Sequence, residues 1–95
     1  MNRNQIIEAI VNYLKQNQVK EIGLFGSFAR NEMKESSDID VLVEYKRGTT
    51  LLDIVRMKQE LNNIIGRKVD LVSKNAVRSS VMNYIKNDLQ VVYHD

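Results

Sequence analysis

The sequence predicts a single α/β (α+β) domain in which a small mixed β-sheet of about four strands is flanked by helices. Segments with helical periodicity alternate with segments of strand periodicity along the 95 residues. About twelve residues separate the first two strand segments, which permits a hairpin-like return and so favours a mixed sheet over an all-parallel one. A chain of this length supports one core, so residues 1–95 are expected to form one domain.

The first half of the chain contains one predicted helix and two predicted strands. Apolar residues recur at helical spacing over 4–17, which predicts an amphipathic helix. Residues 19–25 predict a strand that ends at Gly26-Ser27, and polar residues 28–36 leave room for one helical turn and a loop. Residues 38–45 alternate, with Ile39, Val41 and Val43 on one side and Asp38, Asp40, Leu42 and Glu44 on the other.

The second half predicts two further helices and two strands. Thr50 and Asp53 form a capping box for a helix that ends near Ile65, and Gly66 is a natural stop. This helix is expected to bury Leu52, Val55, Leu61 and Ile65. Residues 68–73 predict the third strand, and Asn75 is expected to cap a helix over 75–87 that buries Val77, Val81, Tyr84 and Ile85. Residues 90–93 predict a short terminal strand.

Composition excludes several classes of site. There is no cysteine and one histidine, which excludes disulfides and thiolate chemistry and leaves oxygen ligands for any metal. Fourteen basic and twelve acidic residues give a net charge of +2, and the basic residues are scattered without a dense run. We therefore expect no direct nucleic-acid binding. Apolar runs are far shorter than the ~20 residues of a membrane span, and no signal-peptide pattern is present, so a cytoplasmic location without membrane contact is expected.

Asp38 and Asp40 lie two residues apart at the start of a predicted strand, so their carboxylates point to the same side of the sheet. Two like charges this close raise the pKa of one or both groups. A cation between them removes the repulsion, and Mg²⁺ suits the position because it is often held by one or two carboxylates and substrate phosphates. An isolated pair of this kind is more often a strand start with a solvated carboxylate, so other residues must decide.

Gly26-Ser27 follows a strand and opens a helical turn. Glycine lets the backbone approach a phosphate, the N–H groups of a helix start favour an anion, and the Ser27 hydroxyl adds a donor. Arg30 lies three residues later on the same face of such a turn, where it suits a phosphate oxygen or a carboxylate such as Asp38. Taken singly, Gly-Ser is also a common turn and Arg30 an ordinary surface arginine.

Asp70 supplies a third carboxylate on the next predicted strand. It lies between Val69 and Leu71, so it faces away from that apolar pair. Burial of this charge is costly unless it is paired or bound to a metal, and an exposed sheet face is the alternative. Together with Gly26-Ser27, the carboxylates Asp38, Asp40 and Asp70 indicate a two-metal phosphoryl-transfer site.

The combined pattern resembles a known superfamily. Gly26-Ser27, ten residues, Asp38-Ile39-Asp40 and a later strand with Asp70 look like the nucleotidyltransferases that include DNA polymerase beta. The string Gly-Ser-Phe-Ala-Arg and the later Ser-Asp-Ile-Asp-Val-Leu-Val resemble the minimal nucleotidyltransferase (MNT) domains, which are antitoxin partners of HEPN-domain ribonuclease toxins. The similarity runs from about Ile22 to Val72, and the flanking helices fit the same domain.

This resemblance implies a nucleotidyltransferase fold and an enzyme that transfers AMP from ATP, with two Mg²⁺ ions, to a tyrosine hydroxyl of a HEPN toxin in a hetero-oligomer. It implies that Gly26, Ser27 and Arg30 bind the nucleotide. By the same resemblance Asp38 and Asp40 bind both metals, and Asp70 binds the catalytic metal and relays the acceptor's proton. Asn31 departs from the glycine that often follows the arginine, but asparagine tolerates a left-handed backbone.

Two other functions remain open from the sequence. A stoichiometric antitoxin would block the toxin by contact, with an accessory nucleotide site. A nucleotidyltransferase acting on a small molecule such as an aminoglycoside is the third alternative, but such enzymes carry an additional helical domain. Only residues 73–95 follow the strand with Asp70, so an acceptor supplied by a partner protein is the expectation.

Overall fold

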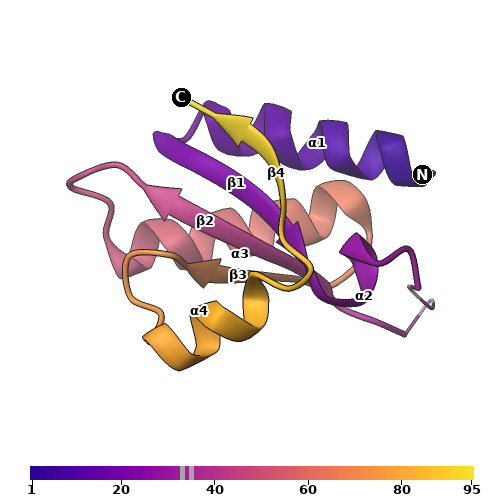
Figure 1. Ribbon diagram of the computed structural model, residues 1–95. Helices are drawn as coiled ribbons and strands as arrows, with labels where there is room; N and C mark the ends of the chain where they lie inside the picture. The colour runs from indigo at the N-terminus through magenta and orange to yellow at the C-terminus, as the bar shows by residue number, and fades with distance from the viewer. Residues whose placement is uncertain (33, 35) are drawn as a thin grey trace.

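The computed structural model describes residues 1–32, 34 and 36–95, which form a four-stranded sheet flanked by helices (Figure 1). The elements are α1 (Arg3–Lys15), β1 (Val19–Phe25), α2 (Gly26–Ala29), β2 (Ile39–Tyr45), α3 (Leu51–Ile65), β3 (Val69–Ser73), α4 (Ser79–Ile85) and β4 (Gln90–His94). The order of helices and strands is the predicted one. The helical turn predicted within 28–36 begins earlier, at Gly26, and residues 33 and 35 of that segment lie outside the described part.

The sheet is mixed, as predicted, with strand order β3-β2-β1-β4. Strand β1 pairs antiparallel with both β2 and β4, whereas β2 and β3 run parallel. The parallel pair needs a crossover, and α3 provides it. As a consequence the end of β1 and the beginnings of β2 and β3 meet at one end of the sheet, beside α2 (Figure 1).

Helices cover both faces of the sheet (Figure 1). On one face, α1 and α3 pack against Ile39, Val41 and Val43 of β2, so the predicted alternation of this strand is confirmed. On the other face, Ile85 of α4 packs with Phe25 and Leu42 in a smaller core. Leu42 therefore has an apolar partner, although it shares its face with the charged side chains of β2.

The buried face of α3 differs from the predicted one. Leu52 and Val55 are 82% and 51% exposed, so their expected burial is wrong, whereas Leu61 and Ile65 are buried as predicted. The buried stripe is Met57, Leu61 and Ile65 at a spacing of four, and neither Leu52 nor Val55 has that spacing from Met57. The Thr50–Asp53 capping box and the left-handed Gly66 at the end are both confirmed.

Helix α4 is shorter than predicted. It begins after Arg78, and Asn75 instead accepts a hydrogen bond from the backbone N–H of Tyr45 at 3.0 Å. Ile85 is buried as predicted and Val77 is half-buried against the same core, but Val81 and Tyr84 are 45% and 68% exposed. A seven-residue helix makes about two turns, so few of its side chains reach the sheet, and Ile85 and the partly buried Met82 form its contact with the core.

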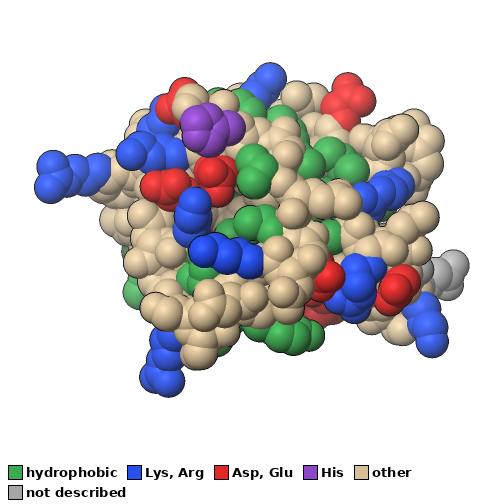
Figure 2. All heavy atoms as spheres, in the orientation of Figure 1, with side chains coloured by type: hydrophobic (Ala, Val, Ile, Leu, Met, Phe, Trp, Pro, Cys, Tyr) green, Lys and Arg blue, Asp and Glu red, His purple; other side chains and the backbone are tan. Residues whose placement is uncertain are grey.

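No helix in the described part of the chain is long and apolar enough to cross a bilayer. On the face seen in Figure 2, basic side chains are scattered among acidic ones and do not form one continuous patch.

Candidate active site

Asp40 and Asp70 are direct neighbours across the parallel pair β2–β3. They lie near the beginnings of their strands, at the end of the sheet where β1 passes into α2. Leu42 and Val72, two residues further along, lie in the smaller core beneath α4, so both carboxylates share the α4 face of the sheet. Two carboxylates from separate strands are thus brought together as the sequence predicts.

The environment of Asp40 disfavours its ionised form. Burial, followed by the charges of Asp70 and Asp38, raises the pKa of the Asp40 carboxyl, and Arg30 acts in the opposite direction. Within the described part of the chain, neither Asp40 nor Asp70 has a hydrogen bond or ion pair to its side chain. Arg30 therefore offsets the repulsion only from a distance, because its guanidinium forms ion pairs with Glu32 and Asp88.

Asp38 is placed differently. Its carboxylate lies 3.5 Å from the ammonium of Lys68, and both side chains are well exposed. Among residues 1–32, 34 and 36–95, no three side chains of His, Cys, Asp or Glu are gathered in a group that could hold a metal ion. The structure thus brings Asp40 and Asp70 together, with Asp38 nearby but turned to a lysine.

Gly26 lies in close contact with Asp40. Its backbone is left-handed, with φ of +70°, and a Cβ at this position would collide with the Oδ2 atom of Asp40. Both features require glycine, because other residues rarely adopt this conformation and any side chain would displace the carboxylate. Phe25 pairs with Asp40 in the β1–β2 ladder, so the chain turns into α2 directly beside the carboxylate.

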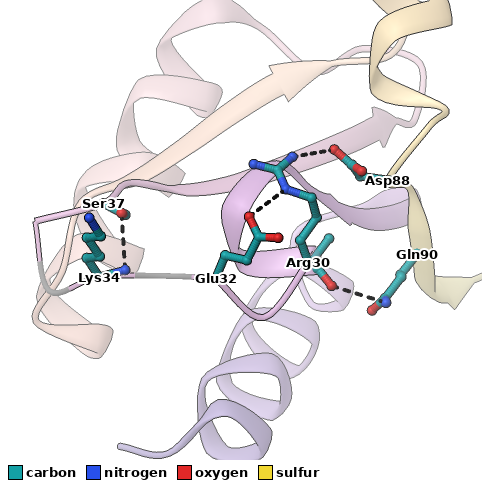
Figure 3. Close-up of polar contacts among 7 residues, drawn as sticks. Arg30, Glu32, Lys34, Ser37, Asp88 and Gln90 are labelled. Atoms are coloured by element: carbon teal, nitrogen blue, oxygen red, sulfur yellow. Dashed lines mark hydrogen bonds and ion pairs between the residues drawn. The ribbon is translucent and has the colours of Figure 1, made fainter.

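Ser27 and Arg30 belong to the turn that follows. Ser27 is half-buried near the start of α2, and its hydroxyl has no hydrogen-bond partner among the described residues. Arg30 closes α2, and its guanidinium contacts Glu32 at 3.2 Å and Asp88 at 2.6 Å (Figure 3). The carboxylates bound by Arg30 are therefore these two, and not Asp38, which the sequence suggested as a partner.

Asn31 adopts the left-handed conformation that its sequence position suggested, with φ of +59°. The N–H of Glu32 donates to the carbonyl of Ser27 at 2.9 Å, and the N–H of Asn31 donates to that of Phe28 at 3.1 Å. These bonds form the Schellman motif that commonly ends a helix. The departure from glycine at Asn31 consequently leaves the shape of the turn intact.

Sequence patterns do not identify the residues that support this site. Arg67 donates to the carbonyls of Lys34 and Ser37 at 2.6 and 3.2 Å and so holds the segment that leads to Asp38. Arg3, Asp88 and Gln90 contact α2 or Arg30 from the two ends of the chain. The sequence shows only that each of these residues is a polar or charged side chain near the boundary of a predicted helix or strand. Such side chains are too common at the surface for that position to identify a supporting residue.

The assembled site suits the binding of a polyphosphate and a hard cation. It offers two adjacent carboxylates, a glycine turn that allows close approach, an unpaired hydroxyl and an arginine held by two carboxylates. Carboxylate oxygens are the ligands that Mg²⁺ prefers, and a cation would relieve the repulsion at Asp40. Transfer of a phosphoryl or nucleotidyl group is the chemistry that such groups support.

Comparison with known proteins agrees with this chemistry. The family model of the nucleotidyltransferase domain matches residues 7–92. A relative from Methanocaldococcus jannaschii, named as a candidate protein adenylyltransferase, is 44% identical over 88 residues, which cover 93% of this chain and 95% of the relative. Protein adenylyltransferase MntA of Thermococcus cleftensis is 39% identical over 75 residues, which cover 79% of this chain and 74% of the relative.

Solved structures share the fold. A structure described as a candidate minimal nucleotidyltransferase has a TM-score of 0.83 at 30% identity, with 95% of each chain covered. A chain from the complex of tri-AMPylated Shewanella oneidensis HEPN toxin with MNT antitoxin has a TM-score of 0.81 at 19% identity, covering 99% of this chain and 74% of that one. A toxin–antitoxin structure with AMP-PNP gives 0.84 at 22% identity, covering 100% and 75%.

Proposed function

The chain belongs to the nucleotidyltransferase domain family and is a nucleotidyltransferase, and from that premise we propose that it transfers AMP from ATP to a tyrosine hydroxyl of a HEPN-type ribonuclease toxin. The modification inactivates the toxin, so the protein acts as an antitoxin. The names of its relatives as protein adenylyltransferases support the reaction. The likeness in fold to chains of HEPN–MNT complexes, one with an AMPylated toxin, supports the partner.

One observation carries the assignment of the site. Asp40 and Asp70 are in register on neighbouring strands, half-buried, and without an ion pair in the described part of the chain. A folded protein rarely leaves two such charges uncompensated unless a ligand completes the site. ATP with its magnesium is the ligand that this family and this set of donors favour.

The donor set fits Mg²⁺. Asp40 and Asp70 supply carboxylate oxygens. The contact of Asp38 with Lys68 is exposed and therefore weak, so the Asp38 side chain is free to leave it and join them. Two carboxylates with substrate phosphates are a common way for proteins to hold this ion. When bound, two Mg²⁺ ions offset the charge that develops on the phosphate oxygens and the leaving group.

The residues of the chain have separate roles in the proposed transfer. Gly26 and Ser27 bind the terminal phosphates through backbone N–H groups and the hydroxyl, and Arg30 steadies the phosphates. The tyrosine oxygen forms a bond to the α-phosphorus as the bond from that phosphorus to the bridging oxygen breaks and pyrophosphate leaves. A carboxylate oxygen of Asp70 accepts the proton of the tyrosine hydroxyl.

Intact-mass analysis of the toxin tests the proposal. A candidate HEPN-type toxin is incubated with this chain, ATP and Mg²⁺, and this chain is then removed. We expect the toxin to stay inactive and to have gained the mass of one AMP or a multiple, because the modification is covalent. Full recovery of ribonuclease activity without a mass change would indicate inhibition by contact alone. Parallel reactions with GTP, CTP and UTP test the preference for ATP.

A further inference from the structure

The carbonyl end of α2 is held by side chains from the two ends of the chain. Arg3 donates from Nη1 to the carbonyl oxygen of Phe28 at 2.6 Å, and Gln90 donates from Nε2 to that of Ala29 at 3.3 Å. The two side chains also contact each other, because Nη2 of Arg3 donates to Oε1 of Gln90 at 3.2 Å. Figure 3 shows Gln90 directed at α2, and Figure 1 shows α1 and β4 passing beside it.

The position of the Arg3 guanidinium is closely determined. It lies 4.7 Å from the centroid of the Phe28 ring, and Phe28 is 1% exposed, so the ring that supports the cation is itself fixed in the core. The planar fork of arginine can serve two acceptors at once, here Phe28 and Gln90. A positive charge also suits the carbonyl end of a helix.

A third contact reaches the same turn. Asp88, two residues before Gln90, accepts from Arg30 at 2.6 Å. The residues that follow α4 therefore hold both the last carbonyl of α2 and the arginine that closes it. None of these three contacts lies at the amide end of α2, where Gly26 lies against Asp40.

Helix α2 needs such external contacts because it has only four residues. A helix of this length has no stability of its own in water, since isolated helices shorter than ~12–15 residues are marginal. Phe28 and Ala29 anchor one side of it in the core, and a single turn held on one side alone is expected to fray. Small displacements matter in a site that positions a phosphate, where ~1 Å can cost about a hundredfold in rate.

We propose that Arg3 and Gln90 are positioning residues for the nucleotide, acting together through the carbonyl end of α2 without contacting ATP. They fix the orientation of this turn, and thereby the placement of Gly26, Ser27 and Arg30 beside Asp40. This inference rests on the proposed nucleotide transfer. It predicts that a change at Arg3, on the first helix, weakens nucleotide binding although the residue lies outside the binding pattern of the sequence.

The test compares two arginines that link elements. Arg3→Met keeps the aliphatic stem over Phe28 and removes the donors. Arg56→Met is the matched control, because Arg56 links α3 to Tyr13 of α1 at 3.5 Å and to Asn17, just beyond α1, at 3.3 Å, and its hydrogen bonds and ion pairs with described residues do not reach α2. We measure the affinity for a non-hydrolysable ATP analogue with Mg²⁺ by calorimetry, and the amide hydrogen exchange of residues 26–31. Arg3→Met is expected to weaken binding about tenfold and to raise exchange in that segment, while Arg56→Met changes neither.

Two more variants separate positioning from general stability. Arg3→Lys keeps the charge and a single donor nitrogen and should bind the analogue with intermediate affinity, because an ammonium cannot serve Phe28 and Gln90 as a planar fork does. Gln90→Leu should resemble Arg3→Met, and the double variant should lose less than the sum, since both act through one turn. Affinity should follow exchange at residues 26–31 and not the melting temperature across this series.

The outcomes distinguish the two levels of the argument. If the wild-type protein does not bind the analogue, the proposed function fails and this inference fails with it. If the wild type binds and Arg3→Met binds equally well, the proposed function stands and the positioning role of Arg3 and Gln90 is wrong. Equal losses of affinity in Arg3→Met and Arg56→Met would likewise overturn it, because the effect would then follow stability alone.

Discussion

Two pairs of carboxylates lie on one face of the same sheet and differ in what accompanies them. Asp40 and Asp70 are register neighbours on β2 and β3, and Glu44 and Glu21 are register neighbours on β2 and β1. The ammonium of Lys74 lies 2.9 Å from Glu21 and 3.9 Å from Glu44, so the glutamate pair has its own cation. The aspartate pair forms no ion pair with any described residue, and Arg30 acts on Asp40 only from a distance.

The contrast shows that a pair of acidic residues across strands does not by itself mark a site. The hydrogen bond to Glu21 and the charges of both glutamates raise the pKa of Lys74, which is what a compensated ionic cluster produces. At the aspartate pair, burial first and then the charges of Asp70 and Asp38 raise the pKa of Asp40. The glutamate pair is compensated within the chain, and we propose that a ligand compensates the aspartate pair.

The largest difference between the aspartate pair and the glutamate pair is expected in the rate of AMP transfer. Asp40→Asn and Asp70→Asn each remove one charge from the aspartate pair with little change of shape, so AMP transfer should fall by about a thousandfold or more. Asp38→Asn should reduce it in the same direction. Glu44→Gln, the same chemical change at the other pair, should leave the rate within a few-fold of the wild type. Retained transfer in both Asp40→Asn and Asp70→Asn would contradict the metal assignment.

A pair of glycines tests how closely the turn must approach Asp40. Gly26 and Gly66 have nearly the same left-handed backbone, with φ of +70° and +73°, but only Gly26 faces an atom that a Cβ would meet. Gly66→Ala should therefore lose roughly 1 kcal/mol of stability through backbone strain alone and keep an unchanged affinity for an ATP analogue. Gly26→Ala should show the same strain and also weaken analogue binding about tenfold.

Thermal unfolding with and without the analogue and Mg²⁺ separates the two effects, because a ligand that binds only the native state raises the melting temperature. An unchanged ligand-induced shift in Gly26→Ala would mean that Gly26 serves the turn and not the phosphate.

Substitution of Lys74 tests whether this lysine stabilises the glutamate pair. Lys74→Met leaves Glu21 and Glu44 facing each other without a cation, and the stability should fall by about 1 kcal/mol, because the lysine is partly exposed and water screens the charges. For a domain of this size the melting temperature should fall by about 4–8 °C. AMP transfer should not change.

Lys20→Met serves as the control for removing a lysine from this region, since Lys20 makes no ion pair with any residue that the structure describes. Adding Glu44→Gln to Lys74→Met should restore part of the lost stability by removing the repulsion. A loss of transfer activity in Lys74→Met would mean that the two ends of the sheet face are not independent.

The comparison also explains how far the sequence could be interpreted. Local signals predict β1, the Thr50–Asp53 capping box and the stop at Gly66 because each depends on neighbouring residues. The alternation of β2 placed Asp40 on one face, and the turn residues placed Gly26 at the end of β1. These features needed no knowledge of distant contacts.

Distant contacts account for what the sequence did not predict. Helix α3 has apolar residues on more than one side, and only its packing against the sheet decides that Met57 is buried and Leu52 exposed. The contact from Arg3 to Phe28 spans 25 residues, and that from Arg30 to Asp88 spans 58. No periodicity or spacing in a single sequence signals partners at such separations.

The smallest expected effect is on the melting temperature without Mg²⁺, and its sign differs between the aspartate pair and the glutamate pair. In the absence of Mg²⁺, Asp40→Asn should raise the melting temperature, on the order of one or two degrees, because it relieves a repulsion that the fold does not compensate. Glu44→Gln should lower it, because it weakens the contact with Lys74. The two substitutions are chemically equivalent and lie on one face of the sheet, so opposite shifts of the melting temperature would follow from the presence of Lys74 beside only one of the pairs.

The pH dependence of stability provides a second measurement of the repulsion at Asp40. Asp40 has a raised pKa in the folded state, so the folded protein binds the proton more readily than the unfolded chain, and the destabilisation due to its charge disappears as the pH falls. The stabilising effect of Asp40→Asn should therefore be full near neutral pH and should shrink as the pH falls toward 3.8, the ordinary pKa of the group. Unfolding of the metal-free wild type and variant across this range measures it. A stability difference that stays constant with pH, or that grows as the pH falls, would show that Asp40 is already compensated in the fold and that the two pairs do not differ in the way their neighbours indicate.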